Sequence, residues 1–326
     1  GVFFGNSVQP AYAKSKLSAL HVEGTKLCDK KGKVVQLRGV STHGLSWYPE
    51  YVNDKYFKEL HDKWGANVVR LAMYTEEYNG YCSSDANNRK NLKALVKKGV
   101  KLAAKYKMYV IVDWHILRDG NPKTHQKASK AFFKDMSKAL KGYDNVLYEI
   151  CNEPNGGTDW KTIKSYAKAV IPVIRENDKD AVIIVGTPTW SQDVDQAAAS
   201  PISGYKNIMY AFHFYAGTHK DDLRNKMTNA IKAGLPVFVT EFGITDASGN
   251  GGIDKKEANK WIKALDKYDV SYVAWNVSNK NESSAMIKSS CTKKSGFKRS
   301  DLSTSGKWTV YHRRNHKITH TVSAGK

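Results

Sequence analysis

Two short stretches each place a glutamate at the end of an apolar run. "YEICNEPNGG" contains Glu153, and "FVTEFG" contains Glu241. Paired carboxylates on opposite walls of a cleft are the groups that glycoside hydrolysis uses, because one stays protonated to help the leaving oxygen depart while the other is ionised to attack or to activate water. These two glutamates are therefore the first candidates for catalysis.

The surroundings of the two glutamates predict different protonation states. Arg70, in "VVRLAMY", is expected to project inward and to hold a carboxylate ionised, which favours a nucleophile. Glu153 precedes Pro154 at the mouth of an apolar strand, where loss of hydration raises the pKa of a carboxyl group and suits a general acid.

Three other carboxylates are given structural or surface roles. Glu149 lies deeper in the same apolar run as Glu153 and is interpreted as a packing or ion-pair residue. Glu76 and Glu77 fall in a polar loop and are expected to be solvated.

Eight apolar, β-branched runs alternate with amphipathic segments. Near-continuous apolar strands indicate burial on both faces, as in a parallel sheet wrapped in helices. Eight β/α units in roughly 275 residues predict a closed (β/α)8 TIM barrel. A doubly wound open sheet is the competing fold, but "GVSTHG" follows the first run where a Gly-rich phosphate loop would stand. The predicted strands are Val35–Val40, Val68–Ala72, Met108–Val112, Val146–Cys151, Val182–Val185, Ile208–Phe212, Val237–Thr240 and Tyr272–Trp275. Helical patterns are clearest at Lys90–Tyr106, Gln126–Leu140, Trp160–Glu176, Asp221–Ala233 and Lys255–Tyr268, with another from about Gly306 to Arg313.

A single catalytic domain is predicted over residues 17–312. It begins with a β-hairpin in "LHVEGTKLCDKKGKVVQLRG", which we expect to turn at Lys30–Lys33 and to cover the lower end of the barrel. Residues 1–16 are interpreted as a leader or extension that holds a signal-peptide remnant ending in Ala11-Tyr12-Ala13, so a secreted, extracellular protein is expected. Residues 313–326 are predicted to be a basic tail.

The carboxyl ends of barrel strands form one rim, and that rim carries the chemistry of such folds. Polar and aromatic residues follow nearly every predicted strand, a concentration that packing does not explain. Trp47, Trp190 and Trp275 follow three different strands and are predicted to be platforms for sugar rings, whereas Trp64 and Trp261 are predicted to be core residues. The polar and aromatic rim residues are His43, Arg70, Tyr74, Asp113, Trp114, His115, Asn152, Trp190, His213, Phe214, Tyr215 and Trp275.

The formal net charge is +21 over 326 residues. The simplest interpretation is a set of solvated helix faces, with lysines spread along the chain, and the alternative is attraction to an anionic surface such as nucleic acid, an acidic polysaccharide or a cell wall. No nucleic-acid-binding motif organises the lysines, so no nucleic-acid partner is expected. No run approaches the roughly 18 to 20 apolar residues of a membrane span, and no membrane partner is expected. The four cysteines have no C-x-x-C spacing, which disfavours zinc, and one disulfide among Cys28, Cys82 and Cys291 is left open.

Several stretches in combination resemble the bacterial endoglucanases of glycoside hydrolase family 5, specifically cellulase subfamily 2, over about residues 17 to 312. They are "YEICNEPNG", "VTEFG", "IVDWHIL", "VVRLAMY", "YAFHFYAGTH", "GVSTHGLSWY" and "WNVSNKNESSA". The resemblance implies a (β/α)8 barrel and retaining hydrolysis of internal β-1,4-glucosidic bonds in cellulose-like glucans, without metal or other cofactor. It implies Glu153 as acid/base and Glu241 as nucleophile. A monomer is expected.

The resemblance also implies binding roles. Arg70 and Tyr215 would hold Glu241, and Asn152 would bind the 2-hydroxyl of the sugar being cleaved. His115 and His213 would line the same subsite, with Trp275 as its floor. Trp190 would lie under the leaving group. Sugars on the non-reducing side would be contacted by His43, Trp47, Tyr74, Lys280 and Glu282. The family is not generally so basic, so the charge of +21 stays unexplained.

Other functions stay open at this point. A related endo-β-glycanase would cleave mixed-linkage glucan, mannan or xylan. A non-catalytic glycan-binding barrel would normally lack one of the two glutamates. A metal-dependent barrel hydrolase would use His43, His115, His213 and Asp113, but no H-x-H pair follows the first predicted strand.

Overall fold

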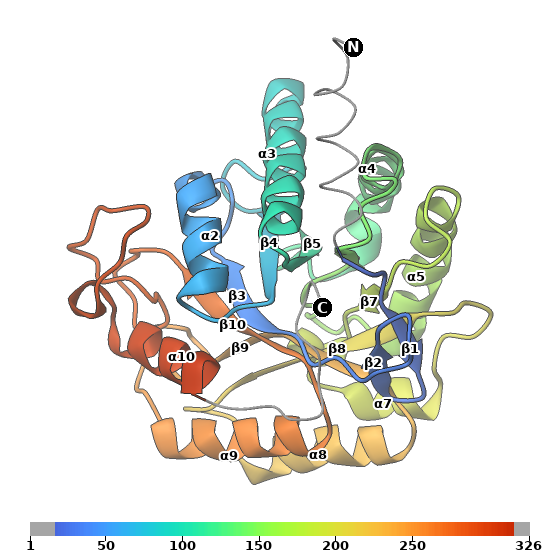
Figure 1. Cartoon of the computed structure of the whole chain (residues 1–326). Coiled ribbons are helices and arrows are strands. Elements are labelled where there is room, and N and C mark those ends of the chain that lie inside the picture. Colours follow the sequence, from blue (N-terminus) through green and yellow to red (C-terminus); the bar gives the residue numbers. More distant parts are fainter. Residues whose placement is uncertain (1–16, 316–326) are drawn as a thin grey trace.

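Eight parallel strands close into a barrel in a computed structural model that describes residues 17–315 (Figure 1). The strands follow one another around the barrel in chain order, and the last pairs with the first. They are β3 (Arg38–Thr42), β4 (Val68–Tyr74), β5 (Tyr109–His115), β6 (Val146–Glu149), β7 (Ile183–Val185), β8 (Ile208–Tyr215), β9 (Val237–Gly243) and β10 (Tyr272–Val277). The predicted (β/α)8 barrel is confirmed, and the doubly wound sheet is excluded.

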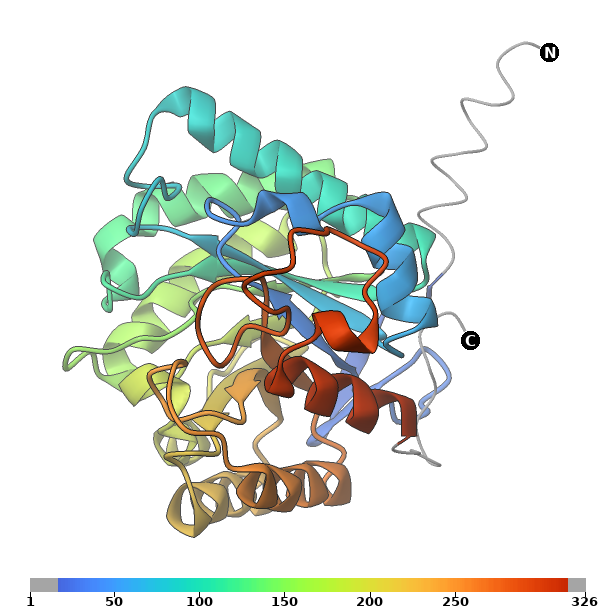
Figure 2. The same cartoon turned by 90° about the vertical axis from the view of Figure 1, so that its left-hand side faces the viewer.

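Helices surround the barrel (Figures 1 and 2). The predicted helical segments are present, but α2 and the short pair α6 and α7 were not among them. In α2, Asn53 caps the first turn by accepting from the backbone N–H of Tyr56, and only Tyr56, Phe57 and Leu60 form its apolar face. Nine residues give too few repeats for a clear pattern. The α-helices are α2 (Asp54–Asp62), α3 (Ala86–Lys105), α4 (Gln126–Ala139), α5 (Trp160–Arg175), α6 (Pro188–Ser191), α7 (Val194–Ala199), α8 (Asp221–Lys232), α9 (Lys255–Lys267) and α10 (Thr304–Asn315). Short 3-10 helices are η1 (Pro49–Tyr51), η2 (Pro122–His125) and η3 (Arg299–Asp301).

The N-terminal hairpin covers the lower end of the barrel, as predicted, but its turn lies elsewhere. Strands β1 (His21–Glu23) and β2 (Lys26–Cys28) are antiparallel and join through Gly24, whose φ of +62° glycine adopts without strain. The predicted turn at Lys30–Lys33 is a second reversal that brings Val34 back beside Cys28. Apolar side chains of this segment pack on the inward residues at the strand starts. The cluster includes Leu17, Leu20, Leu27, Val35, Val68, Ile111, Leu147, Ile184 and Phe238.

A second apolar layer lies between the strands and the helices. Trp64 and Trp261 are buried in it, as predicted, and Trp261 stacks on Phe214 with ring centroids 3.9 Å apart. Trp114 is fully buried in the same layer against Phe132 and does not belong to the chemical rim. Successive strand residues point to opposite faces, so Trp114 faces the helices where its neighbours Asp113 and His115 face inward.

Residues 1–16 lie outside the described part of the chain, and so does the predicted tail beyond Asn315, where α10 ends. Within the described part, all four cysteines are free, which answers the open question of a disulfide. None of the described helices has both the length and the apolar character to span a membrane.

Candidate active site

A cavity of about 550 Å³ opens at the carboxyl ends of the strands. Eleven of the fourteen predicted site residues line it: His43, Tyr74, His115, Glu153, Trp190, His213, Tyr215, Glu241, Trp275, Lys280 and Glu282. Arg70 and Asn152 lie fully buried outside the cavity wall, and Trp47 packs edge-on against Tyr74 at the rim. The cavity wall also includes Leu117, Gln192, His219, Ala247, Ser248 and Gly249. These residues follow strand ends, and His219 is the one that the rim argument could have found from its type.

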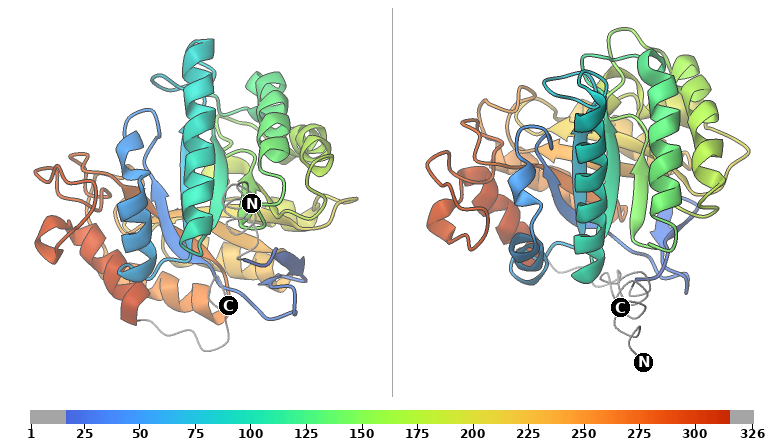
Figure 3. Two further views of the ribbon diagram at one scale, coloured as in Figure 1. Left: turned by 45° about the horizontal axis from the view of Figure 1, so that its top comes forward. Right: turned by 90° about the horizontal axis from the view of Figure 1, so that it is seen from above.

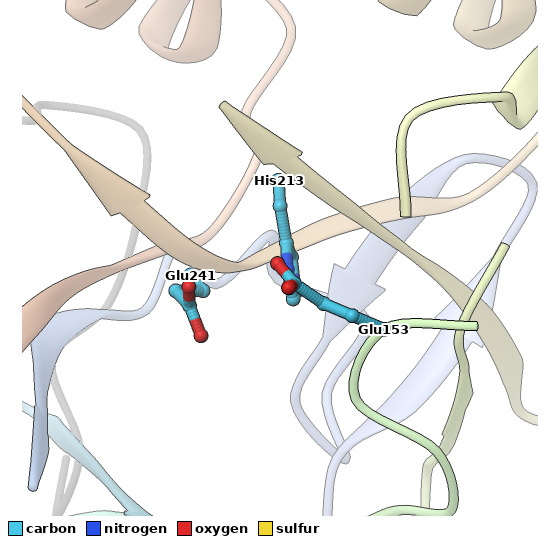
Figure 4. A group of neighbouring side chains, drawn as sticks. All are labelled: Glu153, His213 and Glu241. Atoms are coloured by element: carbon cyan, nitrogen blue, oxygen red, sulfur yellow. The ribbon is translucent and has the colours of Figure 1, made fainter. Parts of the chain in front are cut away.

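Glu153, His213 and Glu241 all line this cavity, and their side chains lie close together (Figure 4). One side-chain donor atom from each of the three lies within 4.8 Å of the others. Retaining glycosidases place their two carboxyl groups about 5 to 5.5 Å apart, whereas inverting enzymes leave about 6.5 to 9.5 Å for a water molecule. The approach of Glu153 and Glu241 therefore fits direct attack by one carboxylate on a sugar.

Glu241 is held in an environment that favours its ionised form. Arg70 donates from Nη1 to Glu241 Oε1 at 2.9 Å, and the Tyr215 hydroxyl donates to Oε2 at 2.6 Å. Burial opposes the charge, but the positive charges of His213 and Arg70 outweigh it and hold the pKa of Glu241 below its usual range. Glu241 therefore has the protonation state of a nucleophile.

Arg70 lies at the centre of a buried ionic network beneath the cavity. Its Nε donates to Glu149 Oε1 at 2.8 Å, and its Nη2 is 3.2 Å from Asp113 Oδ2. Although burial disfavours a charge on Glu149, Arg70 and His213 lower the pKa of Glu149 to about 2. The ion-pair interpretation of Glu149 is confirmed. Because Arg70 also bonds to Glu241, the network sets the position of that carboxylate relative to the barrel floor.

Asn152 is fixed by this network on both sides of its amide. Its Oδ1 accepts from Arg70 Nη2 at 2.7 Å, and its Nδ2 donates to His115 Nε2 at 3.1 Å and to the Ile116 carbonyl. With its Nε2 accepting, the neutral His115 ring carries its proton on Nδ1, which faces Asp113. Burial and the Arg70 charge lower the pKa of His115 to about 3. The sugar contact of Asn152 stays a prediction.

Glu153 has the opposite electrostatic character from Glu241. Burial and the neighbouring Glu241 charge raise the pKa of Glu153 to about 7. Its Oε2 lies 2.7 Å from His213 Nδ1, a hydrogen-bond distance. A carboxyl group with this pKa can donate a proton and later accept one near neutral pH. The general-acid environment predicted for Glu153 is present.

His213 is oriented from behind by a hydroxyl group. The Thr240 hydroxyl lies 2.8 Å from Glu149 Oε2 and 2.7 Å from His213 Nε2. Because ionised Glu149 can only accept, Thr240 donates to it and accepts from Nε2, so Nε2 carries a proton. Although burial favours the neutral ring, contacts with Glu149 and Glu153 raise the pKa of His213 to about 9. His213 is therefore a cation beside both candidate catalytic glutamates.

Aromatic side chains lie in the cavity wall and at the barrel rim. Trp275 forms part of the cavity wall, and the His115 ring stacks on it with ring centroids 5.4 Å apart. Trp47 and Trp190 are 37% and 47% exposed and follow β3 and β7, which lie on opposite sides of the barrel. Lys280 and Glu282 lie near His43, with Lys280 Nζ 3.2 Å from Glu282 Oε1. Trp190 lines the cavity and Trp47 lies at the rim, and their role as platforms for sugar rings stays a prediction.

The donor atoms that could hold a metal are already paired with one another. Among the described residues, Glu153, His213 and Glu241 form the group close enough for a shared ion, and both His213 nitrogens make hydrogen bonds within the protein. His43, His115 and Asp113 do not join this group among the described residues, so the ligand set of the alternative metal-dependent hydrolase is not brought together.

The expectation that Glu77 is solvated is wrong. Its side chain is 13% exposed and accepts from the backbone N–H of Arg118 at 2.9 Å. Burial raises the pKa of Glu77, and Glu76 lies 2.7 Å from His125. The loop that contains Glu77 folds back on the segment after β5, and this contact encloses the Glu77 carboxylate. The polar composition of the loop did not predict that burial.

Comparison with known proteins gives one consistent result. The family model described as Cellulase (glycosyl hydrolase family 5) matches residues 28–281. Endoglucanase A of Butyrivibrio fibrisolvens is 48% identical over 292 residues, which cover 89% of this chain and 67% of that protein. An endoglucanase of Clostridium saccharobutylicum is 49% identical over 288 residues, which cover 88% of this chain and 63% of that protein. The chain thus spans about two thirds of the length of these curated relatives.

Solved structures agree with the relatives in sequence. Cellulase Cel5C_n superimposes with a TM-score of 0.88 at 42% identity, covering 95% of this chain and 96% of that one. The catalytic domain of Thermobifida fusca endoglucanase Cel5A in complex with cellotetraose superimposes with a TM-score of 0.87 at 37% identity, covering 93% of this chain and 100% of that one.

Proposed function

Because the chain belongs to the cellulase family, glycosyl hydrolase family 5, we propose that it is a retaining endo-β-1,4-glucanase. It cleaves internal β-1,4-glucosidic bonds of cellulose and related β-glucans. The observation that carries this proposal is the Glu153–Glu241 pair, close together and with pKa values displaced in opposite directions. Such a pair supplies an acid and a nucleophile at one pH.

The reaction proceeds in two displacements. Glu241 attacks the anomeric carbon while Glu153 transfers its proton to the departing glycosidic oxygen, which gives a glycosyl-enzyme ester and a free 4-hydroxyl. Glu153 is then a carboxylate, and it removes a proton from the water that attacks the same carbon and releases Glu241. Two inversions leave the anomeric configuration unchanged. His213, 2.7 Å from Glu153, stabilises the carboxylate that forms between the two steps.

The position of the exposed tryptophans supports cleavage within a chain. Trp47 and Trp190 lie on opposite sides of the glutamate pair, so a glucan can extend past the reacting bond in both directions. An exo-acting enzyme would need one end of the cavity closed. The cellotetraose complex of the Thermobifida fusca relative supports a β-glucan as the ligand class.

Two properties of the whole protein belong to this proposal. We propose that it acts outside the cell, because a polymeric glucan does not cross a membrane. A monomer suffices for the reaction, since one chain supplies both glutamates, Arg70 and Tyr215.

Product analysis tests the function directly. NMR spectra recorded during hydrolysis of cellopentaose should show the β-anomer of the new reducing end first, followed by slow mutarotation. Mixed-linkage glucan, mannan and xylan, assayed in parallel, should be cleaved more slowly than β-1,4-glucan. Initial release of the α-anomer would contradict the double displacement, and a preference for mannan or xylan would assign the enzyme to a related endo-β-glycanase.

A further inference from the structure

The excess positive charge is concentrated on three consecutive helices. Helices α3, α4 and α5 together carry thirteen lysines, two arginines and one acidic residue, Asp135. Their net charge of +14 is two thirds of the +21 of the whole chain. Helix α2 by comparison holds two lysines and three acidic residues. The lysines that are spread along the sequence are therefore gathered on one side of the folded protein.

These helices form one continuous outer surface. They follow β4, β5 and β6, which are neighbours in the barrel, and the right-hand view of Figure 3 shows them side by side. Lys93 on α3 bonds to Asp135 on α4 at 3.0 Å, and α4 packs directly on α5. We call the exposed lysines of α3, α4 and α5 the basic face; five of them are Lys98, Lys101, Lys127, Lys130 and Lys134.

Little of this charge is neutralised within the described residues. The ion pairs of the three helices are Lys93 with Asp135 and Lys105 with Asp54. A helix face built for solubility alone normally interleaves both signs, as on α8, where Asp221 and Asp222 share the helix with Lys226 and Lys232. Lysines that share one surface without acidic neighbours repel one another, and this repulsion lowers the stability of the folded protein. That cost is offset when an anionic partner lies on the surface.

The side chains of the basic face favour a flexible polycarboxylate over other polyanions. Lysine is a point charge on a flexible stem, whereas phosphate recognition commonly uses the arginine fork. The two arginines, Arg89 and Arg175, donate to backbone carbonyls of their own surroundings. The large exposed apolar side chains of the described residues lie on other segments, so these helices offer no stacking platform for bases and no apolar anchor for a lipid surface.

We propose that the basic face binds a carboxylate-bearing polysaccharide, such as a polyuronate, that accompanies the glucan substrate. The choice of a polysaccharide as the partner rests on the proposed function, whereas the existence of the basic face is independent of it. The N-terminal ends of α3, α4 and α5 approach the catalytic rim, because each helix runs back along the barrel from the carboxyl end of its strand. Glu153 and Glu241 lie in the cavity and not on these helices, so a bound polyanion leaves the cleft open.

The binding test compares two variants of equal charge. The basic-face variant replaces five lysines by glutamine: Lys98, Lys101, Lys127, Lys130 and Lys134. The control variant replaces the five exposed lysines of α9 by glutamine: Lys255, Lys256, Lys260, Lys263 and Lys267. Binding of wild type and both variants to polygalacturonate is measured over a range of salt that includes about 0.15 M. The proposal expects the basic-face variant to bind about tenfold more weakly or worse, with a shallower salt dependence, and the control to stay within about threefold of wild type.

Separate arms identify the partner and check the enzyme. Double-stranded DNA and vesicles containing anionic lipid are measured at the same salt concentrations, and either one binding more tightly than polygalacturonate would overturn the choice of partner. Equal losses in both variants, or none in the basic-face variant, would overturn the basic face itself. Thermal unfolding and cellopentaose hydrolysis should match wild type in both variants. If the wild-type protein fails to cleave cellopentaose, the proposed function is rejected, and the binding result remains valid on its own.

Discussion

Replacing His213 by asparagine should move both limbs of the pH profile of kcat/KM toward higher pH. The positive ring of His213 lies against Glu153 and near Glu241, and it favours the ionised form of both carboxyl groups. Asparagine removes the charge while keeping a polar side chain of similar reach. The pKa of each glutamate is therefore expected to rise.

The size of the shift follows from the separation of the charges. A donor atom of His213 lies within 4.8 Å of a carboxylate oxygen of each glutamate. At 4.8 Å, the upper limit of these separations, two unit charges in a medium of effective dielectric constant 20 interact by about 3.5 kcal/mol, which corresponds to about 2.5 pH units. Because solvent enters the open side of the cavity, we expect a shift of about 1 to 2 units.

The direction of the shift differs in its consequence for the two limbs. Glu153 must be protonated to act as an acid, so the alkaline limb near pH 7 should move upward and activity should persist into more alkaline solution. Glu241 must be ionised to attack, so the acid limb should also move upward and activity should be lost at a less acidic pH. The optimum moves up with both limbs.

Initial rates on cellopentaose at low substrate concentration, measured from acidic to alkaline pH, check this prediction. The matched control is His219→Asn, because His219 lines the same cavity and burial lowers the pKa of its ring, which is neutral beside the Tyr215 N–H. That variant should keep the wild-type profile. A downward shift of either limb, or an unchanged profile in a folded His213→Asn enzyme, would refute the electrostatic role of His213.

Further predictions concern the nucleophile, the ionic network, the aromatic platform and metal dependence. Glu241→Gln should abolish turnover while calorimetry still detects cello-oligosaccharide binding, and substantial residual activity would argue against the nucleophile assignment. Arg70→Met should cost about 3 to 5 kcal/mol in urea unfolding, because Glu149 and Glu241 lose their counter-charge, and an unchanged midpoint would show that the network adds no stability. Trp190→Ala should raise KM for cellopentaose about tenfold, since an exposed ring of this size contributes about 1.4 kcal/mol of stacking, with little change in kcat. Activity should survive treatment with EDTA. If activity is lost and then restored by Zn²⁺ or another divalent ion, the metal-dependent mechanism would be favoured instead.

The sequence alone determined the barrel and the two glutamates. Long apolar runs with no polar face must be covered on both sides, and eight of them alternating with helices indicate a closed barrel with helices outside and packed side chains inside. Once the strands were assigned, Glu153 and Glu241 had to lie on one rim, because parallel strands end on the same side. The local sequence is enough to assign the strands, because the apolar run that indicates a buried strand lies within that strand's own residues.

Several features depended on the tertiary structure. In the sequence "DWH" of β5, Asp113 and His115 point into the barrel and Trp114 points toward the helices. Only the folded structure shows which of these residues face which side. Helix α2 and the Gly24 turn were too short to leave a periodic signal. The gathering of lysines on α3, α4 and α5 became visible only when these helices were seen as neighbours.

The unequal pKa values of the two glutamates are also a tertiary property. Arg70, His213 and Thr240 come from β4, β8 and β9, and their effect on Glu153 and Glu241 depends on ångström distances across the closed barrel. Sequence could name a cation for the nucleophile, because Arg70 stands in a buried strand. It could not show that His213 carries a charge between the two carboxylates, since that charge arises from burial and contacts that exist only after the barrel closes.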